Sequence, residues 1–135
     1  MIRPMKSTKY GFIKFWSALA VMLLYVGDAV AHHAEAAFDH SRVLSVTGTI
    51  KEFLLANPHT LIYLEVAVSI GQTDLAVFQC GSAIVMTRNG WSRNSLKVGD
   101  KIHIDYYPRR DKKPGGMLIT ATREDGEKLT WRPLS

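Results

Sequence analysis

The sequence is short of cysteine, of long apolar runs and of catalytic motifs, and each shortage excludes a class of protein. One cysteine, Cys80, cannot form a disulfide within the chain, so a disulfide scaffold is excluded. The sequence has no nucleophile motif, phosphate-binding glycine loop or HExxH zinc signature, which argues against the familiar hydrolase and nucleotide-binding folds. What is present is a chain of 135 residues with 47% hydrophobic and 21% charged residues, the composition of one globular domain.

The longest apolar run has the features of an export signal. Residues 15–26 are mostly apolar, and this run is shorter than the about 20 residues that a membrane-spanning helix needs. Four basic residues precede it, and the small residues Ala29 and Ala31 follow it, which is the order of a secretory signal peptide. We therefore predict a signal peptide over residues 1–31 and a single mature domain over residues 32–135, in the bacterial periplasm or secreted. An uncleaved anchor is the alternative.

Most of the excess basic charge lies in that signal. The whole chain carries a net charge of +5, but removing residues 1–31 takes away four of the 17 basic and one of the 12 acidic residues and leaves +2. We therefore expect neither a nucleic-acid partner nor a membrane span after cleavage. The remaining basic cluster, residues 109–113, is either a solvated loop or a surface for an anionic ligand.

Alternating apolar residues predict β-strands in the first half of the mature domain. Strands are expected at residues 45–55, 60–69 and 73–80, with a bulge or bend in the first and a hairpin turn at Gly71. The Asn-Pro-His sequence at residues 57–59 separates the first strand from the second.

The second half begins with a short helix. Ser82 is a suitable N-cap, residues 83–89 form about two turns, and Gly90 suits the left-handed position after the helix. The alternation then returns, and predicts strands at residues 101–107 and 117–123 and an edge strand at residues 128–131.

Three strands, a short helix and two strands occur in the order of an OB-fold. We therefore predict an all-β domain with one short helix, folded as a small OB-fold-like five-stranded barrel. A six-stranded barrel or a sandwich is the alternative. Cys80 is expected to be buried as a small apolar residue, with a metal-binding thiolate as the other possibility. The predicted core consists of Ile50, Ile62, Leu64, Val66, Val77, Trp91, Ile102 and Ile104.

Short motifs spread along the mature chain carry a family resemblance. These motifs are His32-His33, Phe38-Asp39, Gly48, Asn57-Pro58-His59, Gly90-Trp91, Leu96, Gly99-Asp100 and Asp125-Gly126. With them, from about His32 to Leu129, the sequence resembles DUF6152, a family of small exported bacterial proteins known only as a domain of unknown function. The resemblance implies an exported single domain and supplies no established reaction.

Nitrogen donors at the mature N-terminus point to copper. Cleavage of the signal leaves His32 with a free α-amine beside its imidazole, and the two can chelate one ion with help from His33. His59 follows Asn57-Pro58 on a stiff corner, in the loop where an OB-fold binds ligands. We predict that His32, His33 and His59 bind Cu(II). The alternatives are a frayed terminus and a structural turn.

Other candidate ligand contacts are polar and aromatic. Asn57, Tyr107, Arg109 and Arg110 are candidates because they lie in or beside the loops that bind ligands in OB-folds. Trp91 is best explained as a buried structural residue, and stacking on a ligand is its alternative role.

Three functions are consistent with these features. The first is a small periplasmic protein, not an enzyme, that binds a transition metal. The second is an OB-fold module that binds an envelope saccharide, a peptide or a small anionic ligand. The third is a copper-dependent oxidase, which is less favoured because the sequence of so short a mature chain gives no evidence of a substrate cleft.

Overall fold

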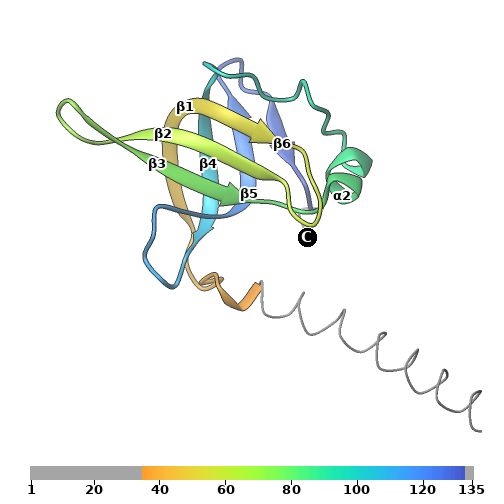
Figure 1. Ribbon diagram of the computed structural model, residues 1–135, viewed down its shortest axis with the longest axis horizontal. Helices are drawn as coiled ribbons and strands as arrows, with labels where there is room; N and C mark the ends of the chain where they lie inside the picture. The colour runs from red at the N-terminus through yellow and green to blue at the C-terminus, as the bar shows by residue number, and fades with distance from the viewer. Residues whose placement is uncertain (1–34, 133–135) are drawn as a thin grey trace, which may run out of the picture. The chain divides into compact units, whose positions relative to one another are not determined.

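A computed structural model describes residues 35–132 of the chain (Figure 1). The predicted signal peptide over residues 1–31 and the two candidate copper ligands His32 and His33 lie outside the described residues. The strands and the helix belong to one compact unit that begins at Ala37. Within the described residues no helix is both long and apolar enough to cross a membrane.

The elements follow the predicted order, and each boundary lies within two residues of the prediction. Ser82 is the N-cap of the helix, with its hydroxyl accepting the Val85 N–H at 3.4 Å, and Gly90 has φ +85° just after the helix. The elements are β1 (Leu44–Leu54), β2 (Leu61–Ser69), β3 (Gln72–Gln79), α2 (Ala83–Arg88), β4 (Lys101–Pro108), β5 (Gly115–Arg123) and β6 (Lys128–Thr130).

Five of the strands close into a barrel. Strand β1 pairs antiparallel with both β2 and β4, β2 pairs with β3, and β4 pairs with β5. A parallel pairing of β3 with β5 completes the circle, and β6 pairs only with β5, on the outside. The order β1-β2-β3-β5-β4 around the barrel, with the helix between β3 and β4, confirms the predicted five-stranded OB-fold-like architecture and not the six-stranded alternative.

Strand β1 is bent where the sequence predicts a bulge. The pairing of β1 with β2 shifts register between Ile50 and Glu52, which leaves Lys51 as the additional residue. A bulge bends the strand, and β1 accordingly pairs with β4 over residues 44–49 and with β2 over residues 48–54.

The closure between β3 and β5 depends on a glycine. Gly115 has φ +108°, and a Cβ atom placed on it would lie 2.0 Å from the Val77 carbonyl oxygen. Only a residue without a side chain permits this approach, so the barrel seam is encoded at Gly115.

The barrel interior is apolar, and one predicted core residue is wrong. Val77 is half-buried and faces outward, because β3 points Ala76 and Phe78 inward and the residue between them must face the other side. Cys80 is buried, 2% exposed, and burial raises the pKa of its thiol, so it packs as a small apolar residue as predicted. The other predicted core residues are all buried, namely Ile50, Ile62, Leu64, Val66, Trp91, Ile102 and Ile104.

The residues before β1, 37–43, form an N-terminal arm that covers one end of the barrel. Phe38 is 1% exposed within the core cluster, and its backbone forms a β-bridge with Arg109 just beyond β4. The Asp39 N–H donates to the Pro108 carbonyl at 2.8 Å, and the Arg110 N–H donates to the Ala37 carbonyl at 2.9 Å. Figure 1 shows this arm (orange) beside the β4–β5 loop, away from α2 and the β1–β2 connection.

Candidate ligand-binding site

The predicted metal ligands are only partly within the described residues. His59 is half-buried in the connection that follows the far end of β1, whereas the arm lies beside the start of β1. His59 and the arm are therefore at opposite ends of this strand. Within residues 35–132, no group of three or more His, Cys, Asp or Glu side chains is placed to hold a metal ion.

Asn57 has a structural partner. Its Oδ1 accepts the Ala83 N–H at 3.1 Å, and the Ala56 carbonyl accepts the same N–H at 2.9 Å. Ala83 is the first residue of α2, so Asn57 ties the β1–β2 connection to the N-terminus of the helix. The Asn57–Pro58 peptide bond is cis.

The two aromatic candidates differ in exposure. Trp91 is 1% exposed, and its indole N–H donates to the Thr130 carbonyl at 2.8 Å, so its geometry is that of the structural role favoured by the sequence. Tyr107 is half-buried, and its ring lies 4.6 Å from the ring of His40 in the arm.

The basic loop uses much of its charge locally. The guanidinium of Arg109 donates to both carboxylate oxygens of Asp111, at 2.8 and 2.7 Å. These bonds hold the pKa of Asp111 at about 2 and raise the pKa of Arg109. The Nε of Arg110 donates to the Phe38 carbonyl at 3.1 Å. Both arginines therefore stabilise the loop and the arm that lies against it.

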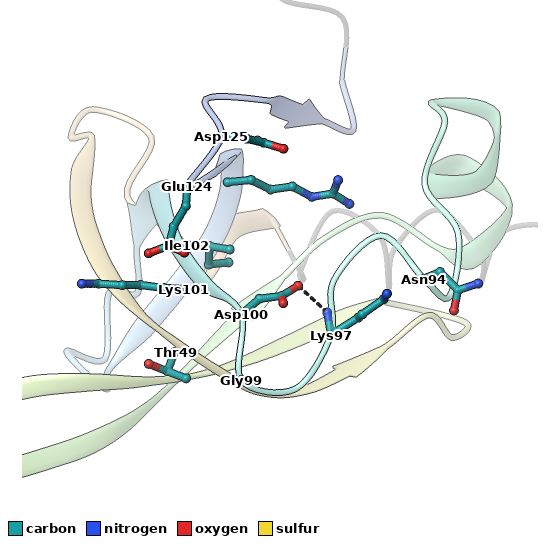
Figure 2. Close-up of a pocket in the computed structure, with 10 residues that line it drawn as sticks. Thr49, Asn94, Lys97, Gly99, Asp100, Lys101, Ile102, Glu124 and Asp125 are labelled. Atoms are coloured by element: carbon teal, nitrogen blue, oxygen red, sulfur yellow. Dashed lines mark hydrogen bonds between the residues drawn. The ribbon is translucent and has the colours of Figure 1, made fainter.

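A polar pocket lies at the other end of β4. It has a volume of about 720 Å³ and is formed by the end of the β3–β4 connection, the first residues of β4 and the turn after β5, with Thr49 from β1 (Figure 2). Ile102, which is 1% exposed, is among its lining residues. Its charged lining residues are Lys97, Lys101, Arg123, Asp100, Glu124 and Asp125. We call this site the polar pocket.

Hydrogen bonds fix the β3–β4 connection beside the polar pocket. The carboxylate of Asp100 accepts the Lys97 N–H at 2.8 Å, drawn as the dashed line in Figure 2. The backbone of Ile50 bonds twice to this turn, accepting from the Gly99 N–H at 2.9 Å and donating to the Asp100 carbonyl at 2.8 Å. Ile50 lies at the β1 bulge, so the bulge holds this wall of the polar pocket in place.

Arg123 joins two walls of the polar pocket. One of its terminal nitrogens donates to the Glu127 carboxylate at 2.5 Å, and the other donates to the carbonyl of Ser95, a residue only 7% exposed. The Asp125 carboxylate accepts the Glu127 N–H at 2.9 Å and orders the same turn. The guanidinium of Arg123 is therefore a structural cross-link and is not available to a ligand as a full partner.

Three charged side chains of the polar pocket remain uncommitted. The side chains of Lys97, Lys101 and Glu124 form no hydrogen bond or ion pair with any other residue in the described range. Figure 2 shows Lys97 and Asn94 on one side of the polar pocket and Lys101 and Glu124 on the other, with Asp100 between them. Uncommitted charges of both signs thus lie on a hydrogen-bonded frame.

A smaller hollow of about 130 Å³ adjoins the polar pocket along the outer face of β4. His103 lies there, with its Nδ1 3.0 Å from the Thr47 hydroxyl and its Nε2 3.4 Å from the Asp105 carboxylate. The Ser45 hydroxyl donates to the same carboxylate at 2.5 Å. Both ring nitrogens of His103 thus have protein partners on this face.

Two of the motifs that carry the family resemblance lie at the polar pocket. Gly99-Asp100 is in the turn before β4, and Asp125 of Asp125-Gly126 is in the turn after β5. The model of a family of unknown function, DUF6152, matches residues 21–121, which is more than half of the chain. The chain belongs to DUF6152. No curated protein is similar enough to it to count as a match.

The DUF6152 match includes one wall of the polar pocket and ends before the other. It covers Asn94, Lys97 and residues 99–102, whereas residues 123–125 lie beyond its last position. The polar pocket is absent from our sequence predictions because its residues come from separate segments and form no compact motif. The two turn motifs were the only sequence signals near it, and a Gly-Asp pair by itself predicts a turn, not a site.

Proposed function

We propose that this DUF6152 protein is an exported, non-enzymatic binding module of the bacterial periplasm or exterior, and that it binds a small polar ligand in the polar pocket. The observation that carries the proposal is the set of uncommitted charges on Lys97, Lys101 and Glu124 around a volume of about 720 Å³. Small-molecule sites commonly measure about 300–1,000 Å³. This corresponds to the second of the three hypotheses drawn from the sequence.

The frame of the polar pocket supports binding with little rearrangement. The turn at Asp100 is bonded to Ile50 of the barrel, and Arg123 connects the opposite wall to the Ser95 carbonyl. Side chains held on such a frame lose less entropy when a ligand binds, because the backbone beneath them is already ordered.

Amide NMR of the mature domain tests this proposal. We expect at least one of three probes, trialanine, chitotriose or inorganic phosphate, to shift the amide signals of Lys97, residues 99–102 and Glu124. The amides of residues 109–113, at the other end of β4, should not move. Each probe is added to about 10 mM, a concentration at which even binding weaker than ordinary specific binding is detected. If none of the three probes shifts these signals, the proposal is contradicted.

The location is tested separately. N-terminal sequencing of the protein from the periplasmic fraction should give His32 as the first residue, because Ala29 and Ala31 occupy the small-residue positions before the cut. An intact Met1 or a start several residues away contradicts cleavage after Ala31.

Copper binding is the second candidate function, and the anchored arm limits which ligands it can use. The bonds of Asp39 and Arg110 fix the chain at Phe38, so a mature terminus at His32 would be tethered six residues from a rigid point. Six residues reach at most about 20 Å. The α-amine, His32 and His33 then form the ligand set, and His59 joins only if the arm extends along β1.

Calorimetry with Cu(II) separates these ligand sets. We expect binding to weaken as the pH falls through about 6.5, where imidazole titrates, and to weaken when one alanine precedes His32, since the extension separates the α-amine from the imidazole. His59→Ala shows whether the third histidine takes part. Equal Cu(II) binding with and without the extension contradicts the terminal chelate.

A further inference from the structure

We infer that the ligand of the polar pocket is a short peptide with free ends, bound with its carboxylate at Lys97 and its ammonium at Glu124. This inference rests on the proposed function, because it names the ligand of the same site. Charge balance, the lack of aromatic side chains among the described lining residues, and the positions of Lys97 and Glu124 on opposite sides of the polar pocket each support it.

Charge balance argues against a simple anion. The charged residues that line the polar pocket are three basic and three acidic, so their formal charges cancel. A site for phosphate or another small anion concentrates positive charge, which gives long-range attraction. The polar pocket has none of that excess, so a ligand that carries both charges matches it better.

The lining argues against a saccharide. Thr49, Asn94 and the charged residues provide hydrogen-bonding groups, but no aromatic side chain lines the polar pocket among the residues that the structure describes. Proteins that bind sugars and bases on OB-folds use aromatic rings as stacking platforms. The half-buried Tyr107 lies at the opposite end of β4.

The positions of the uncommitted charges set the orientation. Lys97 and Asn94 lie on one side (Figure 2), and their ammonium and amide groups are both hydrogen-bond donors for a carboxylate. Glu124 is the uncommitted carboxylate on the other side, with Lys101 on the same side. Asp100 lies between the two sides and adds negative charge along the path of the peptide.

The same separation argues for a peptide over a single amino acid. The ammonium and carboxylate of one amino acid share a carbon atom, so they cannot lie on opposite sides of Asp100 at once. Each added residue lengthens the ligand by about 3.3–3.6 Å and moves its two charges apart. A short peptide such as a tripeptide therefore carries both charges and holds them apart, as a single amino acid does not.

Calorimetry of the mature protein with end-blocked peptides tests the inference. Trialanine should bind, and N-acetyl-trialanine and trialanine amide should each bind at least about tenfold more weakly, because each lacks one charged end, a loss of about 1.4 kcal/mol per tenfold. Chitotriose and inorganic phosphate are the competing probes.

Two substitutions assign the ends. Lys97→Met should remove the preference for trialanine over its amide, and Glu124→Gln should remove the preference for trialanine over its acetylated form. Lys112→Met in the basic loop and Glu52→Gln on β1 change the same types of side chain away from the polar pocket and should alter neither preference. Unfolding curves of all four variants should coincide, because these side chains are exposed or uncommitted.

The outcomes separate the inference from the proposed function. If chitotriose or phosphate shifts the amides of the polar pocket and trialanine does not, the peptide inference is overturned and the proposed function stands. If trialanine and both blocked forms bind equally, the assignment of the ends is overturned. If no probe binds, both fall.

Discussion

The two ends of strand β4 carry similar charges and use them differently. At the Pro108 end, Arg109 is paired with Asp111, and Arg110 is bonded to the arm. At the Lys101 end, the side chains of Lys101 and Glu124 have no protein partner within the described residues. The charges at the first end are satisfied within the protein, whereas those at the second end are the ones that the proposed function assigns to a ligand.

This difference shows that the density of charge along a sequence is a poor guide to its availability. The cluster at residues 109–113 is the most basic stretch of the mature chain. Its arginines nevertheless bind other parts of the protein, because Arg109 is hydrogen-bonded to Asp111 and Arg110 to the Phe38 carbonyl in the arm. The charges of the polar pocket are dispersed over three segments, and the side chains of Lys97, Lys101 and Glu124 form no ion pair within residues 35–132. Exposed local pairs of the first kind contribute little stability, but they do remove binding capacity.

The largest expected effect tests the closure. Phe38→Ala should lower the free energy of unfolding by about 3–5 kcal/mol, because it leaves a cavity where a fully buried ring closes the barrel. Val98 lies in the turn at the other end of β4 and is 74% exposed. Val98→Ala should therefore change the free energy of unfolding by less than about 0.5 kcal/mol. Urea unfolding of both variants provides the measurement. Equal stabilities of the two variants would show that the arm does not belong to the folded barrel.

A smaller effect compares two arginines of equal exposure. The side chains of Arg109 and Arg123 are 32% and 31% exposed, and each is paired with one carboxylate. Only Arg123 also satisfies the carbonyl of a buried residue, Ser95. Arg123→Met should therefore cost about 1–3 kcal/mol, because it leaves that acceptor without a partner.

Arg109→Met is the matched control for this effect. Its partner, the Asp111 carboxylate, is exposed and returns to water when the arginine is lost, so the variant should be clearly more stable than Arg123→Met. The difference between the two midpoints of urea unfolding is the quantity to measure. A larger loss for Arg109→Met would reverse the comparison between the two ends.

The fold could be predicted from the sequence because its signals are local. Alternation predicted β2, and Ser82 and Gly90 marked the ends of α2. A bulge or bend was expected in β1 at the apolar residues 53–55, and the bulge lies just before them, between Ile50 and Glu52. Where prediction failed, the reason was register. In β3 several consecutive residues are apolar, so alternation gave no choice between Val77 and Phe78 as the inward residue.

Alternation also cannot show where a strand leaves the barrel. Val68 continues the inward face of β2 after Ile62, Leu64 and Val66, yet it is 59% exposed. Figure 1 shows the reason, since the β2–β3 hairpin extends beyond the other strands. A residue on the correct face of a strand is buried only where another layer covers it.

The candidate site was less predictable than the fold because it depends on tertiary contacts. The role of Asn57 as a partner of Ala83 connects residues that are 26 apart, and the polar pocket joins Thr49 to Asp125. Such pairings follow from barrel closure and from the positions of the turns in space. The spacing of motifs along the chain gives no information on either, so the sequence did not predict these contacts.

The smallest effect tests the closed end by pH. Asp111 has its pKa lowered to about 2, first by the hydrogen bond from Arg109 and then by the Lys113 N–H and the neighbouring positive charges. Its ordinary value is about 3.9. A carboxyl with a lower pKa in the folded state stabilises the fold above its unfolded pKa and loses that contribution as the pH falls toward its folded pKa.

The stability difference between the wild type and Asp111→Asn should therefore be constant above about pH 5 and shrink between about pH 4 and pH 2. Urea midpoints over this range measure it, and Arg109→Met should remove most of the same pH dependence. A difference that grows as the pH falls would mean that Asp111 is destabilised in the folded state, and the loop could then no longer be described as a closure in which the charges satisfy one another.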